Sequence, residues 1–195
     1  MAKSLSVQIG FTMIEVLVSI IVLAVGLLGM AGLAARTLNA EYESYQRAQA
    51  LILLADIVDK INANRKAAGC YAFSDPSSGA PSLGTGSTIT PACNAYGTAD
   101  EQARAVADLS EWSAKLLGAA EIQSGNSVGA MVGARGCVSF DAATNLYQVS
   151  IAWQGSNATV APTTQDPTWL CGVGLYGPEN ERRLVSATLS IANLR

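Results

Sequence analysis

Histidine is absent from this sequence of 195 residues. Its absence excludes every catalytic triad that contains histidine and removes the commonest general base and metal ligand. Charged residues are also scarce, at 14% of the chain, whereas 50% of the residues are hydrophobic. We therefore expect no enzyme activity, no cofactor and no metal site. A chain this apolar and long enough for only one domain is expected to place part of itself in lipid or against a partner.

Positive charge is not in excess either. The chain has 12 Lys and Arg against 15 Asp and Glu, which gives a formal net charge of -3. Proteins that bind nucleic acid present clustered positive charge to the phosphates. We therefore expect no nucleic-acid partner.

The four cysteines are even in number and include no C-x-x-C pair; they are Cys70, Cys93, Cys137 and Cys171. This spacing disfavours a zinc ribbon or a thioredoxin-like site. Two disulfides in an oxidising compartment and four buried free thiols in a cytosolic protein are the alternatives. Three connectivities are possible, of which we favour Cys70 with Cys93 and Cys137 with Cys171. Each loop closed in this way would restrict the unfolded chain by about 3 to 4 kcal/mol.

Residues 11–35 form an apolar run that contains a single charge, Glu15. A helix of about 25 residues reaches beyond a hydrocarbon core of about 30 Å, so this run is long enough to span a bilayer. It is too long for a secretory signal peptide. A carboxylate in an apolar helix costs a few kcal/mol, so we expect Glu15 to have a functional partner. The alternative is a glutamate near the helix start that reaches water and interacts with the helix dipole.

The string GFTMIEV at residues 10–16 resembles the processing site of type IV prepilins and pseudopilins. That site has a short basic leader, Gly before the cut, Phe after it and Glu at the fifth mature position. The resemblance implies that a prepilin peptidase removes residues 1–10 by cutting between Gly10 and Phe11. It also implies that the new amine of Phe11 is methylated and that Glu15 pairs with the terminal amine of a neighbouring subunit during assembly.

The apolar run, the RGCVSF segment around Cys137 and the RRLV segment at residues 182–185 together resemble the PilV-type minor pilins, also called type IV pilus modification proteins. The resemblance implies an inner-membrane protein whose periplasmic lobe, residues 36–195, primes pilus assembly and stays at the pilus tip on the cell surface. The implied partners are other minor pilins, the major pilin, the prepilin peptidase, the inner-membrane assembly platform and the lipid bilayer. Twitching motility and adhesion would depend on such fibres.

Three alternatives remain open. The first is a minor pseudopilin of a type II secretion system, which the length and the predicted disulfides disfavour because those relatives tend to be shorter. The second is a membrane-anchored enzyme that uses Ser, Asp or Glu, although no set of nucleophile and base is recognisable. The third is an adhesin whose loop at residues 74–98 binds a surface receptor.

The remaining pattern predicts an α+β, pilin-like fold with one long N-terminal helix. Residues 36–66 continue the apolar run without a helix breaker. They place apolar side chains at helical steps, at Leu38, Tyr42, Tyr45, Ile52, Ala55, Val58 and Ile61. We expect a helix of roughly 80 Å, from residue 11 to about residue 65, half in lipid or fibre core and half under the lobe. A hinge near Gly32 followed by a separate helix is the alternative.

The lobe is expected to contain a second helix and a small antiparallel sheet. A loop pinned by a disulfide, at residues 74–98, precedes a helix from about residue 100 to a stop at Gly118, with Trp112 in the core. Alternating residues predict a hairpin over residues 136–153 and a last strand over residues 183–191. We expect Arg182 and Arg183 to begin that strand as solvated side chains, not as an anion site.

Overall fold

The computed structural model describes residues 10–119, 122–124, 126–127, 131–162 and 170–191. The chain divides into two units, and the boundary along the sequence falls between Tyr42 and Glu43. We call the described residues 10–42 the apolar unit and the described residues 43–191 the lobe. Each is described by itself below.

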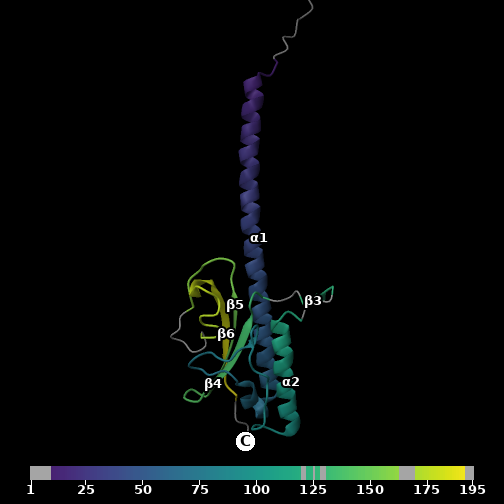
Figure 1. Ribbon diagram of the computed structural model, residues 1–195, viewed down its shortest axis with the longest axis vertical. Helices are drawn as coiled ribbons and strands as arrows, with labels where there is room; N and C mark the ends of the chain where they lie inside the picture. Colours follow the sequence, from purple (N-terminus) through teal and green to yellow (C-terminus); the bar gives the residue numbers. More distant parts are fainter. Residues whose placement is uncertain (1–9, 120–121, 125, 128–130, 163–169, 192–195) are drawn as a thin grey trace, which may run out of the picture. The chain divides into compact units, whose positions relative to one another are not determined.

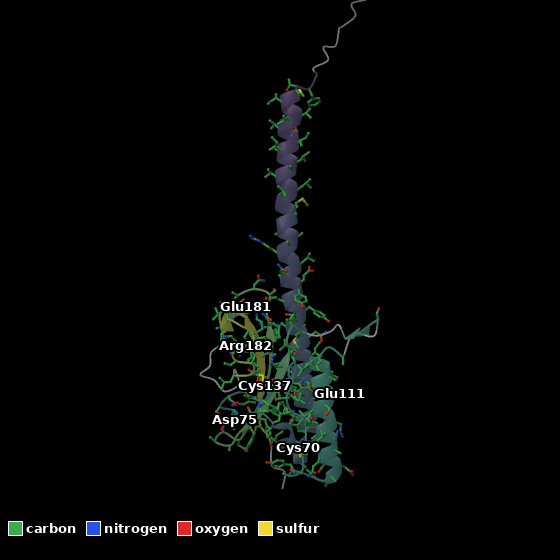
Figure 2. All side chains as sticks on the ribbon, viewed as in Figure 1. Cys70, Asp75, Glu111, Cys137, Glu181 and Arg182 are labelled. Carbon is green, nitrogen blue, oxygen red and sulfur yellow. A yellow bond between two sulfur atoms is a disulfide. The ribbon has the colours of Figure 1, made fainter. Side chains whose placement is uncertain are left out.

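The apolar unit consists mainly of the first part of helix α1 (Met13–Ala63), which has 51 residues (Figure 1). Leu, Ile, Val and Ala dominate this part of the chain, and no proline interrupts it. Every described residue of the apolar unit is exposed, and Figure 2 shows its side chains projecting from the helix. By length and composition α1 is able to cross a membrane, and no residue of its most apolar stretch of 18 residues is buried inside the structure.

In the lobe, α1 buries a different face from the one that we expected. The buried residues are Gln46, Ala50, Leu53, Leu54, Ile57 and Ile61. Of the apolar stripe predicted from the sequence, only Ile61 is buried and Val58 half-buried, while Ile52 remains 61% exposed. This part of α1 carries apolar side chains on more than one face. The sequence pattern alone does not tell which face the lobe covers.

The sheet of the lobe has the order β1-β4-β5-β6 and is antiparallel throughout. Its strands are β1 (Leu83–Gly84), β4 (Arg135–Asp141), β5 (Leu146–Gln154) and β6 (Arg182–Leu189). A separate pair is formed by β2 (Ile122–Gln123) and β3 (Asn126–Ser127). The predicted hairpin and last strand are confirmed. The hairpin turns where the Asp141 carboxylate accepts hydrogen bonds from the Ala143 N–H and the Thr144 hydroxyl.

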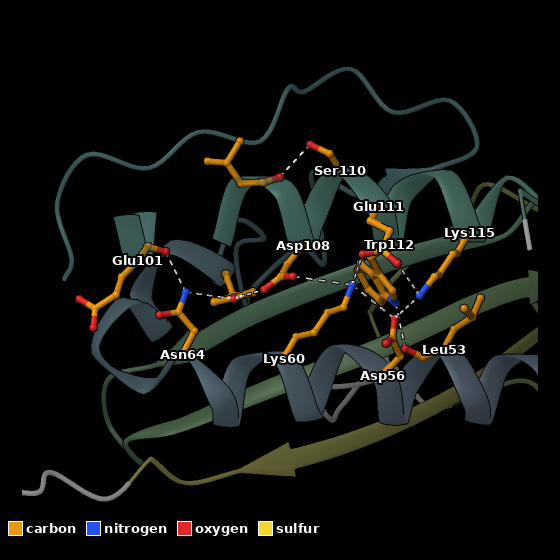
Figure 3. A network of polar contacts seen from close by, with 12 residues as sticks. Leu53, Asp56, Lys60, Asn64, Glu101, Asp108, Ser110, Glu111, Trp112 and Lys115 are labelled. Atoms are coloured by element: carbon orange, nitrogen blue, oxygen red, sulfur yellow. Dashed lines mark hydrogen bonds and ion pairs between the residues drawn. The ribbon is translucent and has the colours of Figure 1, made fainter. Parts of the chain in front are cut away.

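Helix α2 (Ala99–Leu116) lies beside the lobe part of α1, as Figure 3 shows. It begins with a capping box, in which the Thr98 hydroxyl and the Glu101 carboxylate each accept from the other's backbone N–H. The helices are joined by an ion pair between Lys60 and Glu111, with Nζ and Oε2 2.7 Å apart. The short 3-10 helices η1 (Arg65–Tyr71) and η3 (Glu179–Glu181) complete the regular structure of the described chain.

The middle of β5 is a continuous run of buried residues. Because side chains alternate across a strand, this means that both faces of the sheet are covered here. One face packs on the helices and includes Val138, Val149 and Ile151. Trp112 of α2 is fully buried in this core, as expected, and its indole N–H donates to the Leu53 carbonyl at 2.9 Å. The opposite face carries a smaller cluster, Cys137, Ala152, Cys171 and Tyr176.

Gly136 of β4 lies directly against the Trp112 ring of α2. A Cβ at this position would lie 2.2 Å from the Trp112 ring, so only glycine leaves room for the indole. The described chain thus combines a long N-terminal helix, a shorter helix and a four-stranded antiparallel sheet. This is the α+β, pilin-like architecture predicted from the sequence.

Candidate functional site

The candidate site lies at the start of α1, where the apolar run begins. Thr12 immediately precedes the first helical residue, Met13, and so occupies the N-cap position. Its Oγ1 accepts a hydrogen bond from the Glu15 N–H at 3.4 Å, and its carbonyl accepts from the N–H groups of Glu15 and Val16 at 3.1 and 3.3 Å. The bonds from Glu15 satisfy an N–H group of the first turn that has no i→i−4 partner, and the bond from Val16 is the first i→i−4 bond of the helix. Thr12 therefore fixes where the helix starts and, with it, the position of Glu15.

Glu15 lies in the first turn of α1 and is exposed. A carboxylate here is favoured by the positive end of the helix dipole. Its own carbonyl accepts a hydrogen bond from the Ser19 hydroxyl at 2.7 Å. None of the ion pairs formed by the described residues includes Glu15. Its charge therefore remains available to a cation from outside the described chain.

Gly10 and Phe11 precede α1, on either side of the predicted cleavage site. Phe11 is 85% exposed, and a Cβ built on Gly10 would meet nothing within 4 Å. The described part of the chain thus leaves this peptide bond open to approach by another protein. The rest of the predicted leader, residues 1–9, lies outside the described residues. Gly10, Phe11 and Glu15 are brought together at one helix end, because they are neighbours in the sequence.

Thr12 is the residue of this site that sequence reasoning missed. The signal was present as T-x-x-E, a threonine three residues before a glutamate at the start of an apolar run. This spacing is typical of a capping box at a helix N-terminus. We read the glutamate as a charge near the start of an apolar helix and as part of the string at residues 10–16, and did not use its spacing from Thr12.

The four cysteines lie in the lobe and form two disulfides. Cys70 is joined to Cys93 and Cys137 to Cys171, the pairing that we favoured. Figure 2 labels Cys70 and Cys137 at separate places in the lobe. The first bond joins the end of η1 to the long loop that follows it, and the second joins β4 to the segment that covers the smaller apolar cluster. The disulfides stabilise the lobe and are not part of the site at the helix start.

Arg182 and Arg183 are not the solvated side chains that we expected. Arg182 is 1% exposed; its Nε donates to the Glu179 carboxylate at 2.6 Å and its Nη1 to the Cys171 carbonyl at 3.1 Å. Arg183 donates to the Glu43 carboxylate at 3.1 Å. Both guanidinium groups therefore hold the start of β6 in place. The sequence showed two cations at a strand start but not the acids that pair with them.

Glu43, the first residue of the lobe, connects α1 to the end of β5. Its carboxylate accepts hydrogen bonds from the N–H and hydroxyl of Ser156 at 2.9 and 3.0 Å, as well as from Arg183. Burial raises the pKa of Glu43, but the bonds from Ser156 and Arg183 outweigh it and hold the pKa below its usual value. The group therefore stays ionised at neutral pH and links two elements that are distant in the sequence.

The described residues contain no group of three or more Cys, Asp or Glu placed to hold a metal ion.

One comparison with known proteins gives a positive result. Residues 5–31 match the family model of the prokaryotic N-terminal methylation motif. Comparisons with curated proteins and with solved structures yield no match. The match includes the predicted cleavage site, Glu15 and most of the apolar run, and it leaves the lobe uncovered.

The motif and the structure agree on the general class of the chain. A prepilin-type N-terminal motif that continues into a long apolar helix supports a type IV pilin or a pseudopilin. It implies processing by a prepilin peptidase and assembly with other pilins. It also suggests membrane anchoring through the helix and possible incorporation into a pilus.

Proposed function

We propose that this protein is a minor pilin of the PilV type that helps to start a type IV pilus and remains at its tip. One observation carries the proposal: the methylation motif at residues 5–31 includes the first part of a helix whose apolar side chains up to residue 42 have no cover in the described chain. So much exposed apolar surface is unfavourable in water, and such a helix therefore needs lipid or other helices around it. A fibre built from these helices provides that cover.

The first step of the proposed mechanism is processing. A prepilin peptidase hydrolyses the bond between Gly10 and Phe11, which releases residues 1–10 and leaves a new α-amino group on Phe11. Methylation of this amine keeps its positive charge. The exposure of Phe11 and the open space around Gly10 support access of the peptidase to this bond.

The second step is docking by complementary charge. The amine of Phe11 and the carboxylate of Glu15 both become costly in an apolar environment unless each has a partner of opposite charge. Thr12 holds Glu15 in the first turn of α1, near the chain end that processing creates. Glu15 of one subunit therefore pairs with the amine of another and sets the register between two apolar helices. In this role the carboxylate selects a neighbour and does not stabilise the isolated chain.

The third step is transfer from membrane to fibre. Before assembly, lipid covers residues 11–35 and the lobe lies in the periplasm; after assembly, neighbouring pilin helices replace the lipid. The lobe surface selects other minor pilins, and the complex engages the major pilin and the inner-membrane assembly platform. No step requires catalysis or a cofactor from this chain.

A test of the proposal compares pili with secretion in the host. Deletion of the gene in frame should strongly reduce surface pili, counted by electron microscopy, and twitching, while exoprotein secretion by the type II system stays normal. A plasmid copy of the wild-type gene should restore both properties. A minor pseudopilin carries the same motif and predicts the reverse result, lost secretion with normal pili, which would overturn the proposal.

The adhesin alternative is separated by a second variant. Shortening of the loop at residues 85–92 leaves the Cys70–Cys93 disulfide and strand β1 in place. If this variant assembles normal numbers of pili but the cells no longer attach, receptor binding and not priming is the main role of the protein. We expect pilus number and attachment to change together.

A further inference from the structure

The last strand of the sheet, β6, has one open edge. It is an end strand in the order β1-β4-β5-β6 and pairs only with β5 among the described residues (Figure 1). Apart from the ladder with β5, residues 184–189 form no backbone hydrogen bond with another described segment. Within the described residues, the outer N–H and C=O groups of this strand thus have no backbone partner and can accept another strand.

After its first two residues, Arg182 and Arg183, this edge lacks the features that usually block strand pairing. Edge strands are commonly protected by charged side chains, by proline or by a bulge. From Leu184 to Ile191 the chain reads LVSATLSI, which contains no charge and no proline. The register between β5 and β6 is continuous from Arg182 to Leu189, so no bulge interrupts the strand. This edge is therefore suited to binding an additional strand.

A groove of about 520 Å³ lies along the first half of β6. The segment 159–162 forms a further wall of the groove. A hydrogen bond from the Thr159 N–H to the carbonyl of Asn180 in η3, at 2.8 Å, holds this segment. Leu51 and Arg47 of α1 also line the groove. Leu51 is 48% exposed and gives the groove an apolar contact next to the strand edge.

Arg47 supplies the charge that defines the occupant. It is exposed, lines the groove and makes no ion pair with the described residues. The other two cations of the groove are neutralised, Arg182 by Glu179 and Arg183 by Glu43. A ligand that brings a carboxylate to Arg47 is therefore complementary in charge to the groove.

We propose that the open edge of β6 binds an extended segment of a partner protein, which adds a strand to the sheet and places an Asp or Glu against Arg47. Main-chain hydrogen bonds to β6 would provide affinity, and the contact with Arg47 would provide register. A second copy of this chain pairing through its own β6 offers no such carboxylate, because residues 182–191 contain no acid. The proposal concerns the lobe alone and does not depend on whether the fibre is a pilus or a pseudopilus.

The test uses the full chain in its host, with a photo-reactive amino acid at Ser186, a half-buried residue that lines the groove. Irradiation should link Ser186 to one segment of one partner protein, identified by peptide mass mapping, and that segment should contain an acid. Arg47→Glu should lower the yield of this crosslink at least about fivefold, because the new carboxylate repels the acid of the partner. Arg65→Glu makes the same change at an exposed position outside the groove and should leave the yield unchanged.

Charge exchange completes the test. Replacement of the mapped acid by Arg in the partner should restore the yield with the Arg47→Glu chain, and the purified variant should melt at the wild-type temperature. The proposal is wrong if Ser186 links to residues 163–169 of its own chain or to a second copy. It is also wrong if the yield does not exceed that of a probe at exposed Ser110 on α2, or if Arg47→Glu leaves the yield unchanged.

Discussion

The apolar unit and the lobe are both rich in apolar residues, yet they use them in opposite ways. In the apolar unit every described residue is exposed, including Phe11 at 85% and Leu28 at 73%. In the lobe, Ile57, Trp112 and Val138 are fully buried. Apolar surface is stabilising only when it leaves water, so the lobe is stabilised from within and the apolar unit from outside. Substitutions should therefore separate into those that affect assembly and those that affect folding.

The largest effect is expected for Glu15→Ala. The variant chain should be processed and inserted, and its lobe should melt at the wild-type temperature. Its incorporation into sheared pili, measured by immunoblot, should fall at least about tenfold, because a buried charge without its partner costs about 3 to 5 kcal/mol. Glu41→Ala, the same change in an exposed position after the apolar run, should have no effect. Normal incorporation of the Glu15 variant would count against pairing with the amine.

The next largest effect is on the lobe, through loss of the Cys137–Cys171 disulfide, which closes a sequence separation of 34 residues. The double variant Cys137→Ser, Cys171→Ser should be destabilised by about 2 to 5 kcal/mol, measured by urea unfolding of the full chain in detergent. Processing at Gly10 should not change. Mapping of non-reduced peptides should join Cys137 to Cys171 and Cys70 to Cys93; any other pairing contradicts the structure.

A smaller loss of stability is expected for Gly136→Ala. The added Cβ would meet the Trp112 ring at 2.2 Å, and such overpacking costs about 1 to 3 kcal/mol. Gly26→Ala is the matched control in the apolar unit, since a Cβ there meets nothing within 4 Å. The control should leave urea unfolding of the lobe unchanged. Equal effects of the two substitutions would show that the lobe and the apolar unit are not independent.

The smallest effect concerns Glu111, which joins α2 to α1. Hydrogen bonds from Lys115 and Lys60 lower the pKa of Glu111 to about 2. Because the pKa is lower in the folded state, the stability that these bonds add is complete above the unfolded pKa of 4.5 and is lost as the pH falls toward about 2. The side chain is 54% exposed, so we expect less than about 1 kcal/mol.

The variant Glu111→Gln tests this contribution. Its unfolding free energy should depend less on pH between about 4.5 and 2 than that of the wild type. High salt should reduce the difference between the two proteins, because the pair is partly exposed. An unchanged pH profile would show that the ion pairs of Glu111 with Lys60 and Lys115, drawn in Figure 3, do not contribute to stability.

Short-range signals explain most of what the sequence predicted correctly. Helix α2, the hairpin around Asp141 and the strand β6 each follow from patterns within about twenty residues. The candidate site at Glu15 was found in the same way, from a local motif. What the sequence did not show depends on distant contacts. Arg183 pairs with Glu43, which lies 140 positions earlier, and nothing local to either residue indicates the other.

The buried face of α1 was missed for the same reason. Apolar residues occur on several sides of the helix, and only the folded lobe determines that Ile57 is covered while Ile52 is not. The lobe leaves Leu51 and Ile52 exposed. The pattern of a helix tells that it has an apolar face, but the partner decides which face is used.

The most direct test of the central claim is the mass of the intact N-terminus of the protein recovered from membranes, with and without the prepilin peptidase of the host. We predict a chain that begins at methylated Phe11 when the peptidase is present and retains residues 1–10 when it is absent. A chain that begins at Met1 in both cases, or one cut near Ala35, would contradict the assignment to the pilin pathway.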